Sequence, residues 1–121
     1  MRGDWIGSPR NRLSVWEDAM EFKNAVVRKR ANIYHGGNVT SRSIVTADGE
    51  MKTLGIMLPG VYRFNTEAPE VVDLIQGRCR VKVADATDWQ EYGAGESFNI
   101  PGHSHFEIEV TELIDYLCHF S

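Results

Sequence analysis

The sequence has no long apolar run and no large excess of either charge. No uninterrupted apolar segment approaches the roughly 18 residues that cross a membrane, and residues 1–19 lack the apolar core of a secretory signal. The net charge of −4 gives no electrostatic reason to expect nucleic acid or an anionic membrane as a partner. We therefore expect a cytoplasmic protein with neither nucleic acid nor a membrane as partner.

Several motifs of common enzyme classes are absent as well. No glycine-rich phosphate loop opens a helix, and the sequence contains neither a Gly-x-Ser-x-Gly nucleophile elbow nor a Cys-x-x-Cys pair. The two cysteines, Cys79 and Cys118, each lie in a segment of alternating apolar residues. This placement is typical of buried, reduced thiols of the cytosol rather than of a disulfide.

Helical periodicity is missing after Phe22, where turn signals separate short segments rich in valine, isoleucine, threonine and aromatic residues. Val81 and Val83 alternate with Arg80 and Lys82, so one face of that strand is buried and the other is wet. The turn signals are Gly36-Gly37, Asp48-Gly49, Pro59-Gly60, Gly77, Gly93, Gly95 and Pro101-Gly102. About ten short strands of this kind predict an all-β sandwich or barrel, because closure removes exposed strand edges.

The chain of 121 residues is long enough for one domain with one core. We expect residues 22–121 to form the barrel. Residues 1–21 are expected to be an N-terminal extension or arm, because glycine, proline and arginine interrupt them without a sustained period. Trp5 and Trp16 leave open that this arm docks on a partner subunit.

The segment from Gly60 to Gly77 keeps part of a known metal-binding pattern. The first motif of cupin barrels has two histidines one residue apart, then a glutamate, and a glycine after six further residues. Glu70 and Gly77 keep the last spacing, whereas Phe64 and Thr66 occupy the two histidine positions. The segment therefore resembles a cupin motif from which the histidines have been lost.

The second cupin motif is altered in the same way. Gly95 and Pro101 keep its spacing, and Phe106 stands where the last histidine would be. A divalent transition metal needs about three or four N, O or S donors, and Glu70 alone supplies too few. We therefore predict a single-domain, jelly-roll-like cupin barrel that binds no metal.

The substituted positions predict a different kind of pocket. Strand alternation places Phe64, Thr66, Ser104 and Phe106 on the inner face. Phenyl rings stack on any nucleobase, and the carboxylate of Glu70 accepts hydrogen bonds from ribose hydroxyls or an amino group. These residues are therefore candidates for binding a flat, hydroxylated ligand. The alternative is that both phenylalanines simply fill a small barrel.

His103 and His105 have the spacing of paired metal ligands, but no third or fourth donor is apparent near them. In a strand they share the face opposite to Phe106. His103 follows the Pro101-Gly102 turn at a strand mouth. It is therefore a candidate proton donor or phosphate ligand, with an ordinary surface histidine as the alternative.

Two further clusters allow a functional and a structural interpretation. Trp89, in the loop of residues 85–89, either caps the pocket or closes one end of the barrel. Arg78, Arg80 and Lys82 form a basic cluster around Gly77. The cluster is either a solvated strand face or a phosphate site.

Six blocks of sequence together resemble the small cupin-fold pyrimidine/purine nucleoside phosphorylases. The blocks are MLPGVYRF (57–64), APE (68–70), IQG (75–77), DATDWQ (85–90), GESFNIPGHS (95–104) and YLC (116–118). The resemblance covers residues 22–121 and leaves out the arm. It implies a homodimer that phosphorolyses diverse purine and pyrimidine nucleosides to the free base and (deoxy)ribose 1-phosphate. Phosphate is the co-substrate, and neither a cofactor nor a metal is needed.

A mechanism follows as a hypothesis. Ionised Glu70 orients the ribose hydroxyls and stabilises positive charge on the sugar as phosphate attacks the anomeric carbon. Phe64 and Phe106 hold the base by stacking, and Thr66 and Trp89 complete the binding surface. Ser104 and His103 bind phosphate or assist the leaving base, which makes Glu70 and His103 the candidate catalytic residues.

Two other functions stay open. One is a non-catalytic cupin module that binds a nucleoside or a sugar. The other is a metal-dependent dioxygenase or isomerase, which would require donor side chains at positions 64, 66 and 106, and the sequence supplies none there. Phosphate-dependent release of base separates the phosphorylase from the binding module.

Overall fold

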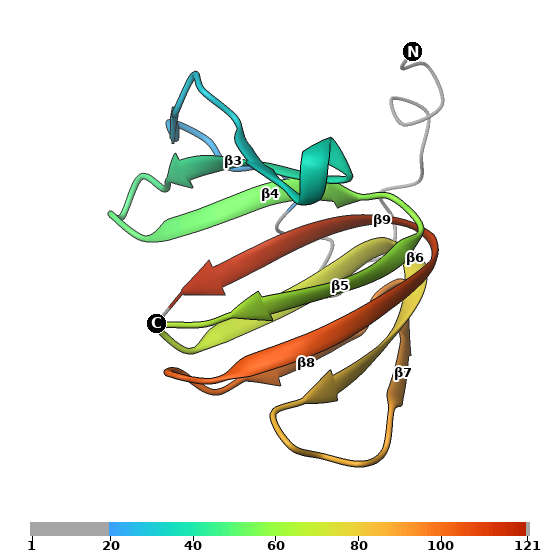
Figure 1. Ribbon diagram of the computed structural model, residues 1–121. Helices are drawn as coiled ribbons and strands as arrows, with labels where there is room; N and C mark the ends of the chain where they lie inside the picture. The colour runs from blue at the N-terminus through green and yellow to red at the C-terminus, as the bar shows by residue number, and fades with distance from the viewer. Residues whose placement is uncertain (1–19, 121) are drawn as a thin grey trace.

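A computed structural model describes residues 20–120. In this range nine strands form a single antiparallel sheet, and one short 3-10 helix lies between two of them (Figure 1). The elements are β1 (Val26–Val27), β2 (Asn32–Tyr34), η1 (His35–Gly37), β3 (Val39–Val45), β4 (Met51–Met57), β5 (Gly60–Asn65), β6 (Glu70–Val83), β7 (Gln90–Gly93), β8 (Ser97–Ile100) and β9 (His105–Phe120). The all-β prediction is confirmed. No helix within the described range is long and apolar enough to cross a membrane. Of the expected arm, residues 1–19 lie outside the described residues.

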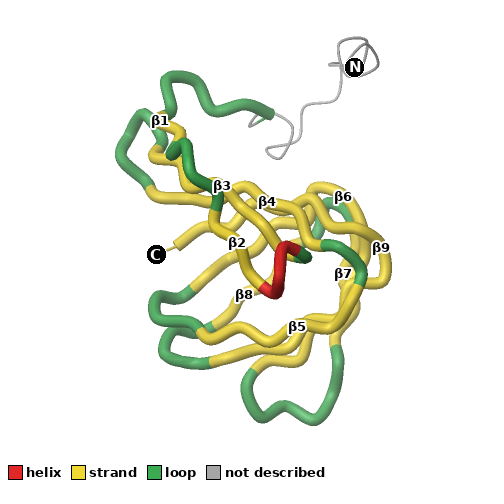
Figure 2. The backbone as a smooth tube through the Cα atoms, turned by 45° about the horizontal axis from the view of Figure 1, so that its top comes forward, coloured by secondary structure: helices red, strands yellow, loops and turns green. Residues whose placement is uncertain are grey.

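The sheet folds over on itself because β6 and β9 belong to two layers. In the first layer, the N-terminal half of β6 and the C-terminal half of β9 pair with each other and are flanked by β8 and β4. In the second layer, the remaining halves pair and are flanked by β7 and β5. Strands β3, β2 and β1 extend the first layer beyond β4. Figure 2 shows the strands curling around a common interior.

Gly77 lies inside β6, so the prediction of a turn at this position is wrong. The pairing of β6 with β9 shifts register on both sides of Gly77. The residue has φ +100, and a Cβ there would run into the backbone carbonyl oxygen of Leu113. Only glycine fits such a positive φ and close approach without strain. The irregularity bends β6 where it passes from one layer to the other.

The core lies between the two layers and follows the alternation seen in the sequence. Leu74, Ile108 and Ile114 are completely buried. Cys79 and Cys118 are buried and free, as predicted. The turn predicted at Asp48-Gly49 is also confirmed, because it connects the antiparallel pair β3 and β4.

Candidate functional site

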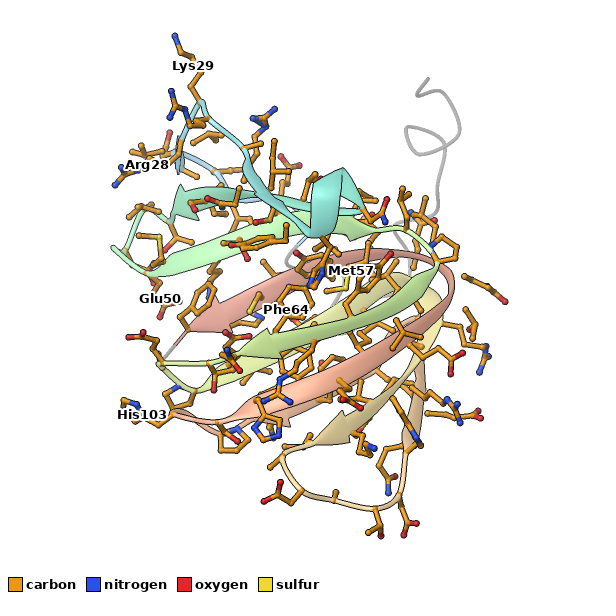
Figure 3. The ribbon with its side chains drawn as sticks, in the orientation of Figure 1. Arg28, Lys29, Glu50, Met57, Phe64 and His103 are labelled. Carbon is orange, nitrogen blue, oxygen red and sulfur yellow. The ribbon has the colours of Figure 1, made fainter. Side chains whose placement is uncertain are left out.

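An aromatic row lines the inner face of the second layer. Phe64 of β5 stands opposite Phe106 of β9, and their rings stack with centroids 5.5 Å apart. Phe106 is buried, whereas Phe64 is half-buried and lies in the interior in Figure 3. The rings of Tyr34 and His35 meet Phe64 edge-on at 5.9 and 5.0 Å. The structure therefore brings the two predicted phenylalanines together and adds two aromatic rings from β2 and η1.

A polar row lines the inner face of the first layer. Ser41 and Ser43 of β3 both accept hydrogen bonds from the side-chain amide of Asn32 on β2, each at 3.1 Å. Across β4, the strand register aligns Ser41 with Tyr116 and Ser43 with Cys118 of β9. Hydroxyl, amide and thiol groups thus follow one another on a face that would otherwise be apolar. Buried polar groups need hydrogen-bond partners, and here the Asn32 amide and the two serine hydroxyls bond one another.

Gly55 makes room for the tyrosine of this row. A Cβ on Gly55 would lie 2.7 Å from the Tyr116 hydroxyl oxygen and would also meet the carbonyl oxygen of Thr40. The hydroxyl end of the Tyr116 ring therefore lies over Gly55, which the strand register aligns with Ser41. Burial raises the pKa of Tyr116 far above its ordinary value. The phenol stays protonated at neutral pH and can donate a hydrogen bond.

Glu70 is the only carboxylate on this inner face within the described residues, and it is half-buried at the start of β6. One of its oxygens, Oε1, lies 3.6 Å from Sγ of Cys118 and accepts its S–H hydrogen bond. Burial raises the pKa of Glu70 above its ordinary value, and the Cys118 bond offsets part of that rise. Burial, together with the neighbouring Glu70 charge, also raises the pKa of Cys118, so this sulfur is a thiol rather than a nucleophilic thiolate.

Thr66 and Ser104 lie close together at the rim near the end of β5. The Thr66 hydroxyl donates to the carbonyl oxygen of Pro101 at 2.7 Å and accepts from the Ser104 N–H at 3.0 Å. The Thr66 N–H in turn bonds the Ser104 carbonyl oxygen at 2.9 Å. These contacts tie β5 to the turn before β9. The donor of Thr66 is therefore engaged in the fold, and its predicted role in substrate binding stays a prediction.

His103 occupies the exposed side of the same turn. Its φ is +51, its backbone N–H bonds the Glu67 carbonyl oxygen at 3.0 Å, and its side chain points outward in Figure 3. His105 is half-buried and alternates with buried Phe106, as expected for the opposite strand face. The geometry thus places His103 at the rim, in an exposed turn that bonds the segment before β6. No group of three or more His, Cys, Asp or Glu side chains within residues 20–120 is arranged to hold a metal ion.

Trp89 lies apart from the aromatic row. The Arg80 guanidinium carbon and the Lys82 ammonium sit 4.6 and 5.1 Å from its ring centroid. Both cations alternate with the buried residues of β6, and they also form ion pairs with Glu109 and Glu107 on β9. Trp89 is therefore part of an outer-face cluster of stacked cations. The prediction that it caps the pocket has no support from this geometry.

The sequence interpretation missed Tyr34, His35, Asn32 and Tyr116. They come from segments far from the cupin motifs, and short strands such as β2 carry little periodicity. One signal was present. In the run Asn32-Ile33-Tyr34, a polar and an aromatic residue are separated by one position, which places both on the same face of a strand.

Comparisons with known proteins agree on family and fold. Residues 29–120 match the family model described as pyrimidine/purine nucleoside phosphorylase. Relatives with that name include one from Cupriavidus necator, 46% identical over 104 residues that cover 86% of this chain and 99% of the relative. Another, from Burkholderia vietnamiensis, is 48% identical over 102 residues that cover 84% and 96% of the two chains.

Solved structures give the same result. A protein of unknown function from Acinetobacter sp. ADP1 has a TM-score of 0.81 and 43% identity, covering 84% of this chain and 98% of its own. The oxalate decarboxylase of Bacillus subtilis has a TM-score of 0.65 at 16% identity, covering 84% of this chain and 30% of its own. The second likeness concerns the fold alone, and it confirms the prediction of a cupin fold.

Proposed function

From the premise that this chain belongs to the pyrimidine/purine nucleoside phosphorylase family, we propose that it phosphorolyses both purine and pyrimidine nucleosides without a metal ion. The products are the free base and ribose or deoxyribose 1-phosphate. A homodimer is part of the proposal and rests on the family resemblance. A cytoplasmic location is also proposed and is supported by the two free cysteines.

The observation that carries this proposal is the pairing of an aromatic row with a single carboxylate. Phe64 is half-buried, with the Phe106 ring stacked on it and the Tyr34 and His35 rings meeting it edge-on, so it belongs to a partly exposed aromatic wall that suits a planar ligand. Stacking of a base on an aromatic side chain contributes roughly 1–3 kcal/mol and tolerates any base. A wall that recognises bases by stacking rather than by hydrogen bonds suits an enzyme that accepts both classes.

Glu70 supplies the electrostatic part of the reaction. As the glycosidic bond loosens, positive charge develops on the sugar, and a nearby carboxylate stabilises it most strongly where water is excluded. The half-burial that raises the pKa of Glu70 also means that its ionised form is poorly solvated. A cationic sugar therefore gains more from this carboxylate than it would from an exposed one. Tyr116 is a neutral donor on the same inner face that can orient the ribose hydroxyls. The Asn32 amide oxygen can accept from them, because both side-chain N–H groups of Asn32 already bond Ser41 and Ser43.

Incubation of the purified protein with uridine or inosine tests the proposal directly. We expect free base and sugar 1-phosphate to appear only when inorganic phosphate is present, as measured by chromatography. Base that appears equally without phosphate would identify a hydrolase. Binding of the nucleosides without release of base would identify the non-catalytic module instead.

A further inference from the structure

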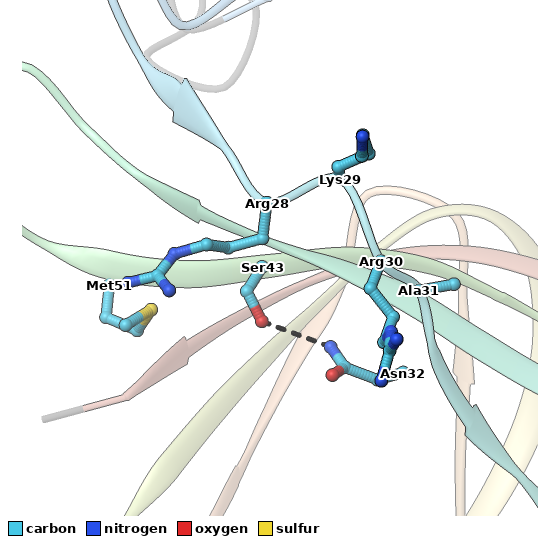
Figure 4. Close-up of a pocket in the computed structure, with 7 residues that line it drawn as sticks. All are labelled: Arg28, Lys29, Arg30, Ala31, Asn32, Ser43 and Met51. Atoms are coloured by element: carbon cyan, nitrogen blue, oxygen red, sulfur yellow. Dashed lines mark hydrogen bonds between the residues drawn. The ribbon is translucent and has the colours of Figure 1, made fainter.

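A basic groove lies at the rim of the barrel where the chain enters β2. Its volume is about 460 Å³, and it is lined by Arg28, Lys29, Arg30, Ala31, Asn32, Ser43 and Met51 (Figure 4). Figure 4 shows the Arg28 and Arg30 side chains on either side of Ser43, whereas Lys29 points away. The groove therefore presents two guanidinium groups, an amide and a hydroxyl to a single space.

Within residues 20–120, the cations of this groove have no acidic partner. None of its cations forms an ion pair with a carboxylate of residues 20–120, whereas Lys52, Arg80 and Lys82 each do. Two planar guanidinium groups of this kind are suited to phosphate, because each can donate two parallel hydrogen bonds to its oxygens. In the other basic cluster, formed by Arg78, Arg80 and Lys82, the last two form ion pairs with glutamates.

The backbone of the groove is held in place by hydrogen bonds. The Arg28 N–H donates to the Ser43 carbonyl oxygen at 2.9 Å, and the Arg42 guanidinium donates to the Lys29 carbonyl oxygen at 2.9 Å. The Asn32 amide is fixed by its bonds to the two serines of β3. The backbone of the segment before β2 is therefore held in one conformation by these hydrogen bonds, so the groove is pre-formed.

Ser43 of the groove is aligned with Cys118 of the interior site through the strand register. Ser43 pairs with Thr53, and Thr53 pairs with Cys118, whose thiol contacts Glu70. Neighbouring strands lie about 4.8 Å apart, so Ser43 and Cys118 are separated by roughly 10 Å across the inner face. A nucleoside that binds with its sugar between Cys118 and Ser43 would bring its anomeric carbon to a phosphate held in the groove.

We propose that this groove is the subsite for the phosphate group, with Arg28 and Arg30 as its principal ligands; the inference rests on the proposed function. An oxygen of hydrogen phosphate forms the new bond to the anomeric carbon, and the bond from that carbon to the base nitrogen breaks. The electron pair of the broken bond goes to the base. The proton that hydrogen phosphate carried ends on the base nitrogen, which leaves neutral base and sugar 1-phosphate.

Steady-state kinetics of Arg28→Gln and Arg30→Gln test this assignment. We expect each variant to raise KM for phosphate by roughly tenfold, the scale of one lost charge-assisted hydrogen bond, and to leave KM for the nucleoside unchanged. Arg78→Gln is the charge-matched control in the other basic cluster, and it should leave both constants unchanged. Unchanged KM for phosphate in both groove variants, or an equal rise in Arg78→Gln, overturns the proposal.

Binding without turnover separates this inference from the proposed function. Calorimetric titration of the full chain with inorganic phosphate, and separately with ribose 1-phosphate, should show binding that the double variant Arg28→Gln/Arg30→Gln weakens. Equal binding by the wild type and the double variant overturns the subsite. A wild type that binds phosphate through these arginines but releases no base supports the subsite and refutes phosphorolysis. Circular dichroism of each variant checks that the barrel is intact.

Discussion

The partial burial of Glu70 affects both the protonation of its carboxyl group and the stability of the fold. Its pKa is raised because half of its surroundings are protein rather than water. Between the ordinary pKa of about 4.3 and the raised value, the folded chain therefore binds a proton that the unfolded chain has lost. The contribution to stability is present below the ordinary value and is lost as the pH rises through the raised one.

Replacing Glu70 with glutamine should consequently separate function from stability. We expect Glu70→Gln to lower kcat by at least about tenfold, because the neutral amide cannot stabilise a cationic sugar. The same variant should melt at a higher temperature than the wild type at pH 8, and the difference should vanish at a pH near 4. Turnover assays and thermal melts across this pH range measure both effects.

Glu91→Gln is a suitable control because Glu91 is exposed on β7. It should change neither turnover nor the pH dependence of melting. If Glu70→Gln keeps full activity, the carboxylate is a structural partner of Cys118 only.

Single residues were predictable from sequence where a motif fixes their spacing. The positions of Phe64 and Phe106 followed from the cupin spacing, and the structure brings these rings together. No motif spacing constrained the position of Trp89. The sequence predicted that Arg80 and Lys82 face outward from their strand, but it did not predict that Trp89 packs against them. His35 reaches the site through a left-handed backbone turn with φ +50, which L-residues seldom adopt and which no periodicity reveals.

At the scale of the element, β4 can be crossed by Tyr116 only because Gly55 has no side chain. We expect Gly55→Ala to lower the free energy of unfolding by about 1–3 kcal/mol, the usual cost of overpacking. The new methyl group would be trapped between the tyrosine ring and the backbone of Thr40. Urea denaturation monitored by tryptophan fluorescence measures this loss.

Gly93→Ala provides the matched control. A Cβ at Gly93 meets nothing closer than an Arg78 side-chain nitrogen at 3.5 Å, which is ordinary contact with a flexible group. Its effect should stay within about 0.5 kcal/mol. Equal effects of the two substitutions would mean that Gly55 is not required by the packing of Tyr116.

The strands as a class were predictable, but their continuity was not. Alternation of apolar and polar residues marks Val81 and its neighbours as a strand in any context. The same local signals divide β6 at Gly77, because a glycine in a bulge and a glycine in a turn look alike in sequence. Only the pairing with β9, which begins more than twenty residues later, shows that β6 continues through it.

For the molecule as a whole, the replacement of metal ligands by an aromatic row predicts activity that needs no metal. Phosphorolysis should survive prolonged treatment with a chelator, followed by gel filtration into metal-free buffer. The described residues offer no cluster of three donor side chains, and a catalytic transition metal needs about that many. Elemental analysis that finds stoichiometric iron, manganese or zinc, together with loss of activity on its removal, would contradict this expectation.

The place of β9 in the fold also bears on how the chain is made. It is the last of the nine described strands to leave the ribosome, yet β4, β5 and β6 all pair with it. During synthesis, β4 can pair with β3, but its other edge and the edge of β5 have no partner until β9 has been translated. Because a domain folds as a unit, the barrel closes only after the codons for β9 are read. A message cut before His105 therefore yields a chain without its central strand, rather than a barrel with a frayed tail.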